Sequence, residues 1–68
     1  MNPSELTKRQ WKICEAVALG LTHYYMGTND RRELTVADYK ESALLLPKLP
    51  KGWMQSGDKM PWSCLNKK

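Results

Sequence analysis

The sequence predicts a mostly α-helical small domain, in which two capped helices form a hairpin and an irregular C-terminal segment packs across it. Three observations support this prediction. The chain has 68 residues, 41% of them hydrophobic, which is enough for one small domain with a thin core. Two stretches show apolar residues at helical spacing behind a capping signal. After them the composition changes to Trp, Pro and Lys. We therefore expect residues 1–68 to form a single domain.

The first helix is predicted over about 8–26. Thr7 and Gln10 have the spacing of a capping box, and Leu6 and Trp11 that of a hydrophobic staple. Apolar residues then recur at spacings of three and four, which is one face of a helix: Trp11, Cys14, Ala18, Leu21 and Tyr25. Gly20 costs a helix about 1 kcal/mol relative to Ala. We expect a bend there, and an end at Gly27.

The second helix is predicted over about 36–46. Thr35 and Asp38 form another capping box, and Pro47 ends the helix because a proline restricts the residue before it. One face is apolar and is expected to face the first helix: Val36, Tyr39, Ala43 and Leu46 line it, and Leu44 and Leu45 broaden it. The opposite face would expose Asp38, Lys40 and Glu41. Two such helices joined by a short loop suggest an antiparallel helical hairpin.

The segment after Pro47 has two open interpretations. Its prolines favour extended backbone, and residues 56–58 read as a turn. Trp53 and Trp62 either fold back across the helices, each covering ~150–250 Å², or stay partly exposed as binding anchors. Residues 63–68 are expected to fray.

The net charge of +4 lies entirely in the C-terminal segment. Residues 1–46 hold six basic and six acidic side chains, whereas residues 47–68 hold five lysines and one acid. A run of lysines is often simply a solvated surface. It can also provide diffuse attraction to phosphates or to an acidic protein face.

Catalysis has little support in this sequence, and we expect no enzyme, no cofactor and no metal site. His23 is the single histidine, and no second histidine or cysteine stands at ligand spacing. On one helix Cys14 and His23 would lie ~13 Å apart, so they cannot form a catalytic pair. Two cysteines are too few for a disulfide framework, and Cys14 reads as a core residue. With no apolar run of membrane-spanning length, we expect a cytoplasmic protein.

Two fragments resemble DNA-binding families. Residues 6–22, from Leu6-Thr7-Lys8-Arg9 to Gly20-Leu21-Thr22, resemble the opening helix of LuxR-type helix-turn-helix domains. Leu34-Thr35-Val36, with Ser56-Gly57 before Pro61, is similar to small excisionase and MerR-like winged helices. The resemblance implies a helical DNA-binding element. However, Pro47, Pro50 and Gly52 stand where its recognition helix would lie.

If nucleic acid is the partner, the phosphate-binding candidates are the basic side chains of the first helix, the loop and the tail. They are Lys8, Arg9, Lys12, Arg31, Arg32, Lys48 and Lys51.

A protein partner, possibly an acidic one, is the favoured expectation. Aromatic residues and methionine are enriched at protein interfaces, and the C-terminal segment supplies Trp53, Met54, Met60 and Trp62. The sequence therefore predicts a small non-catalytic binding protein. Its size and basic character are typical of accessory or inhibitory factors of phages and other mobile elements. A small DNA-binding protein with a helix-turn-helix or excisionase-like element is the alternative.

Overall fold

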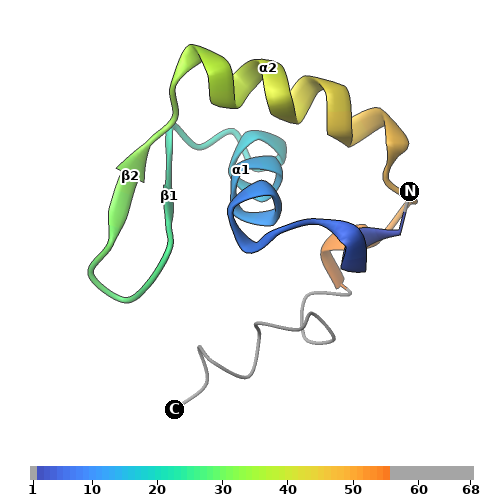
Figure 1. Cartoon of the computed structure of the whole chain (residues 1–68), viewed down its shortest axis with the longest axis horizontal. Helices are drawn as coiled ribbons and strands as arrows, with labels where there is room; N and C mark the ends of the chain where they lie inside the picture. The colour runs from blue at the N-terminus through green and yellow to red at the C-terminus, as the bar shows by residue number, and fades with distance from the viewer. Residues whose placement is uncertain (1, 56–68) are drawn as a thin grey trace.

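The computed structural model describes residues 2–55 and contains two α-helices and a two-stranded β-hairpin (Figure 1). The elements in chain order are η1 (Pro3–Glu5), α1 (Lys8–Ala18), β1 (His23–Tyr25), β2 (Arg31–Glu33), α2 (Val36–Leu45) and η2 (Leu46–Lys48). The predicted turn at 56–58, the frayed end at 63–68, and the candidate residues Met60 and Trp62 lie outside the described residues.

Helix α1 begins where the sequence predicts. The Thr7 side chain accepts a hydrogen bond from the Gln10 backbone N–H (3.1 Å), and the Gln10 side chain accepts one from the Thr7 backbone N–H (3.0 Å). This reciprocal pair is the capping box, and it satisfies two backbone donors that the first helical turn leaves open.

The predicted end of the first helix at residue 26 is wrong, because α1 ends at Ala18. Gly20 has φ +78°, the left-handed conformation that favours glycine. The backbone N–H of Leu21 bonds to the Ala16 carbonyl (2.8 Å), and that of Gly20 to the Val17 carbonyl (3.1 Å). These two bonds form a Schellman motif, which terminates a helix. Gly20 therefore stops the helix instead of bending it.

Residues 23–33 form an antiparallel hairpin, which the sequence prediction missed. His23 pairs with Glu33, Tyr24 with Arg32, and Tyr25 with Arg31. The strands contain aromatic and β-compatible side chains, and residues 28–30 (Thr-Asn-Asp) supply the turn. The hairpin occupies the chain between the two helices, so it also replaces the second helix that a helix-turn-helix would require there.

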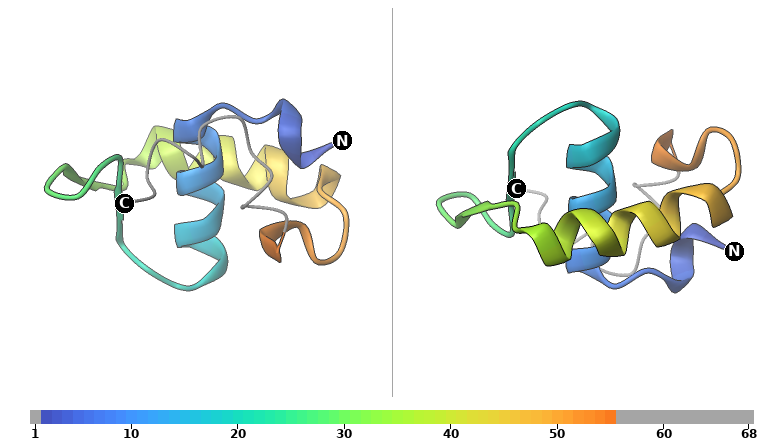
Figure 2. Two further views of the ribbon diagram at one scale, coloured as in Figure 1. Left: turned by 90° about the horizontal axis from the view of Figure 1, so that it is seen from below. Right: turned by 90° about the horizontal axis from the view of Figure 1, so that it is seen from above.

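Helix α2 is capped as predicted and spans nearly the predicted residues. The Thr35 side chain accepts from the Asp38 N–H (3.2 Å), and the Asp38 carboxylate accepts from the Thr35 N–H (3.0 Å). The two helices are not antiparallel neighbours, however. Helix α2 runs across α1, and the hairpin lies beside the N-terminal end of α2 (Figures 1 and 2). The antiparallel helical hairpin is therefore wrong.

The core consists of two clusters on opposite sides of α1. The first cluster contains Leu6, Trp11, Cys14 and Trp53, with Leu45, Leu46 and Leu49 packed against it. The second contains Ile13, Ala16 and Tyr24, with Met26 and Leu34. Because both sides of α1 are covered, this helix is the centre of the fold.

Trp53 folds back onto the helices, as one of the two interpretations predicts for this residue, whereas Trp62 lies outside the described residues. Its ring meets the Trp11 ring edge-on, with centroids 4.8 Å apart and planes at 83°. Such T-shaped pairs are favourable beyond the area that they bury. Trp53 is only 9% exposed, so it is a core residue.

Candidate protein-binding surface

Helix α2 differs from the prediction in which side faces inward, although Leu45 and Leu46 of the predicted apolar face do pack against the first core cluster. Asp38 is 4% exposed and Ser42 is fully buried. Val36 and Leu44, in contrast, are 71% and 69% exposed. The prediction that Val36, Tyr39 and Ala43 face the core is therefore wrong, as is the prediction that Asp38 is exposed.

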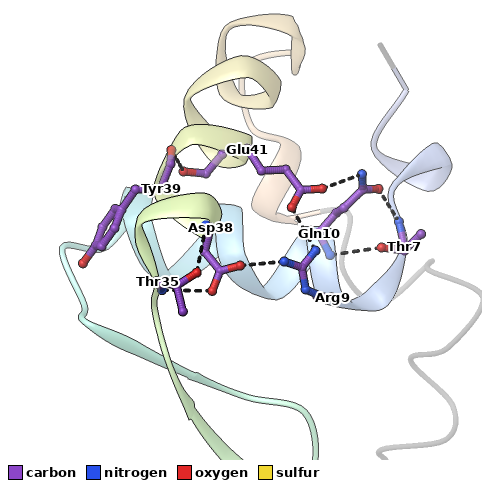
Figure 3. A network of polar contacts seen from close by, with 8 residues as sticks. Thr7, Arg9, Gln10, Thr35, Asp38, Tyr39 and Glu41 are labelled. Carbon is purple, nitrogen blue, oxygen red and sulfur yellow. Dashed lines mark hydrogen bonds and ion pairs between the residues drawn. The ribbon is translucent and has the colours of Figure 1, made fainter.

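A network of charged side chains explains this orientation (Figure 3). The Arg9 guanidinium of α1 contacts Oδ1 of Asp38 at 2.6 Å and Oε1 of Glu41 at 2.8 Å. Nε2 of Gln10 donates to Oε2 of Glu41 (3.2 Å). The hydrogen bond with Glu41 and the negative charges of both carboxylates raise the pKa of Arg9. The inner face of α2 is thus attached to α1 by charge as well as by packing.

The other buried polar group of α2 is satisfied inside its own helix. The Ser42 hydroxyl donates to the Tyr39 carbonyl (2.9 Å). Among residues 2–55, no buried side-chain nitrogen or oxygen lacks a hydrogen-bond partner. The polar inner face therefore carries no unpaired group that would favour turning the helix over.

The outward side of α2 carries a nearly charge-free surface, which we call the outer face. All of its members are exposed: Val36, Ala37, Tyr39, Lys40, Ala43 and Leu44. Lys40 is the single charged residue among them. A helix side that faces water is normally polar. Contiguous exposed apolar side chains are instead typical of interaction sites.

The prediction that Leu44 broadens the inward face of α2 is wrong, and the sequence contains a signal against it. Leu44, Leu45 and Leu46 are consecutive, and successive helical residues point about 100° apart. Three leucines in a row therefore cannot all face one neighbouring helix. In the structure Leu45 and Leu46 pack against the core cluster, and Leu44 faces outward.

Two of the four residues predicted to bind a protein fall within the described residues, and they behave differently. Trp53 is committed to the core, whereas Met54 beside it is exposed. Within residues 2–55, Met54 is therefore the predicted protein-binding residue whose side chain is accessible.

The arginines among the predicted phosphate-binding residues all face carboxylates. Arg9 holds Asp38 and Glu41, Arg31 pairs with Glu33 (3.0 Å), and Arg32 pairs with Asp30 (3.1 Å). Lys8 and Lys48 also interact with other groups of the chain. Lys12 is half-buried on α1, and Lys51 is exposed. The described arginines are therefore largely neutralised locally.

Cys14 is buried in the first core cluster and is chemically protected. Burial, together with the negative charge of Glu41, raises the pKa of its thiol from 9.0 to about 11. The thiolate is the reactive form of cysteine. In a Cys64→Ser variant, we expect a thiol reagent at pH 8 to modify Cys14 only as fast as the protein unfolds. Rapid modification of the folded variant would contradict this burial.

The raised pKa of Cys14 also makes the stability of the protein depend on pH. The folded pKa lies above the unfolded one, so stability from this thiol is fully present below pH 9.0 and is lost as the pH rises toward about 11. We expect a Cys14→Ala variant to lose less stability than the parent over this interval, as measured by urea unfolding at several pH values. Equal losses would exclude a contribution from Cys14.

Comparisons with protein families, with curated proteins and with solved structures find nothing that matches this chain. Within residues 2–55, no group of three or more His, Cys, Asp or Glu side chains is arranged to hold a metal ion. In the same residues, neither helix has the length and apolar character needed to cross a bilayer.

Proposed function

We propose that this chain is a small non-catalytic binding protein, and that a protein partner docks on the outer face of α2. One observation carries the proposal. Val36 and Leu44 are about 70% exposed on a helix whose opposite side is attached to α1 by ion pairs. An apolar face held in this orientation gains stability only when another surface covers it.

The arrangement suits recognition of a helix by a groove. In that mode, apolar side chains at helical spacing enter a hydrophobic groove on the partner. Val36 and Leu44 would be the two anchors, with Tyr39 beside them. Helix α2 is already ordered by its capping box and by Arg9. Docking therefore would not require the cost of ordering a helix.

Occupying a partner's groove is enough to regulate it. A chain of 68 residues with a thin core can supply one rigid face, and that face can block or stabilise a larger protein. We propose this as the mode of action, in line with an accessory or inhibitory factor of the phage or mobile-element type.

Substitution of an anchor tests the proposal. Leu44→Glu should weaken capture of the partner from a lysate of the source cells by about 30-fold or more, the effect of losing an interface hot spot. The unfolding free energy should change by less than about 0.5 kcal/mol, because Leu44 is exposed. Lys51→Glu, an exposed substitution outside α2, is the control and should retain capture.

The nucleic-acid alternative predicts a different pattern. Captured material would be nucleic acid, and its affinity would fall by orders of magnitude between ~50 and ~200 mM salt. Leu44→Glu and Lys51→Glu would then weaken binding alike. Equal retention of a protein by Leu44→Glu and by the parent would also contradict docking on the outer face.

A further inference from the structure

We infer that the partner surface which covers the outer face of α2 carries a carboxylate opposite Lys40. This inference rests on the proposed function and specifies the chemistry of the partner. It starts from the position of Lys40, which is the one charged residue of the outer face and lies at its middle.

Lys40 has only apolar neighbours along its own helix. On a helix, the residues that lie beside position i are i±3 and i±4. For Lys40 these are Val36, Ala37, Ala43 and Leu44. An acidic residue at one of these positions could pair with the lysine, but none of the four is acidic.

The acids nearest in sequence are already occupied. Asp38 and Glu41 point to the other side of α2, where Arg9 binds both (Figure 3). Among residues 2–55, the structure contains no ion pair for Lys40. Lys40 therefore rises from a ring of apolar residues and has no carboxylate partner within residues 2–55.

Covering this ring has an electrostatic consequence. A purely apolar partner would bury the Lys40 ammonium, or force it to the rim, without a counter-charge. An unpaired buried charge is strongly unfavourable. The methylene stem of lysine can extend along apolar surface and bring its charge to an edge. A carboxylate at that edge would pair with the ammonium, while Val36 and Leu44 fill the groove on either side.

A second copy of this chain fits the outer face poorly. In a two-fold symmetric pairing of α2 with its own copy, the middle residue meets itself, so Lys40 would face Lys40. Each copy also brings a net charge of +4. An acidic groove that covers the outer face has neither problem.

The test uses a random peptide library displayed on phage and selected on the immobilised full chain. We expect the selected peptides to combine apolar residues with Asp or Glu.

The best of the selected peptides is then made synthetically, and its binding to the full chain is measured by fluorescence anisotropy. Leu44→Glu should abolish binding. Lys40→Glu should weaken binding about tenfold or more. A peptide in which the acid is changed to Lys should bind the Lys40→Glu protein better than it binds the parent protein. Lys51→Glu is the charge-matched control and should bind like the parent.

The possible failures are distinguishable. Peptides that need Leu44 but bind Lys40→Glu as well as the parent overturn the inference and leave the proposed function standing. A selection that yields no Leu44-dependent peptide overturns the docking surface itself. Sedimentation of the parent as a dimer that Leu44→Glu converts to a monomer also overturns the inference, since the occupant would then be a second copy.

Discussion

Replacing Trp53 with alanine is expected to destabilise the protein by about 3–5 kcal/mol, as for other buried Trp and Phe side chains. Trp53 is 9% exposed and packs edge-on against Trp11 at 4.8 Å. A chain of this length has a total stability of only ~3–10 kcal/mol. The expected loss is therefore a large fraction of the total stability. Urea titration followed by far-ultraviolet circular dichroism measures the loss.

The neighbouring methionine gives a matched control for this prediction. Met54 is adjacent in the chain but exposed, so Met54→Ala should change the unfolding free energy by less than about 0.5 kcal/mol. A loss for Trp53→Ala as small as this would mean that Trp53 is not part of the core, and would restore it as a candidate for partner binding.

Replacing Arg9 with alanine is expected to cost about 2–3 kcal/mol. The variant leaves the Asp38 side chain, only 6% exposed, without its cation at 2.6 Å. Breaking a fully buried pair costs ~3–5 kcal/mol. The value is lower here because the Arg9 side chain is 42% exposed and solvent screens its charge. Thermal or urea unfolding of the variant measures the effect.

Two comparisons isolate the contribution of the Arg9–Asp38 ion pair. Arg31→Ala removes an exposed arginine from an exposed ion pair with Glu33, and it should cost less than about 1 kcal/mol. In an Asp38→Asn background, Arg9→Ala should cost less than in the parent, because the buried charge is already gone. If Arg9→Ala and Arg31→Ala have equal effects, the Arg9 network does not fix α2.

The parts of the fold that the sequence predicted correctly are local. Both helix starts follow from capping boxes, in which two residues three positions apart satisfy each other's backbone groups, so the information is contained in the short segments Thr7–Gln10 and Thr35–Asp38. The end of α1 was equally local but was misread. Apolar spacing continued to Tyr25, and Gly20 was treated as a cost within a helix. In the structure its positive φ closes a Schellman motif.

The candidate site could not be derived from the sequence in the same way. Its apolar residues were recognised, but they were assigned to the core because a stripe on an isolated helix does not say which side is covered. Met60 and Trp62, also predicted as binding residues, lie outside the described residues. The accessible residues of the proposed surface, Val36 and Leu44, were thus found only once the contacts of α2 were known.

The sequence by itself determined where the two helices begin and that α2 reaches Leu45. Only the tertiary structure decided which side of α2 faces inward. Arg9 and Asp38 are 29 residues apart in the chain, and their pairing depends on the hairpin that turns α2 across α1. Once they meet, a buried carboxylate needs its cation, whereas an apolar side chain can remain exposed at smaller cost. The charged side of α2 therefore turned inward, and Val36 and Leu44 were left facing outward.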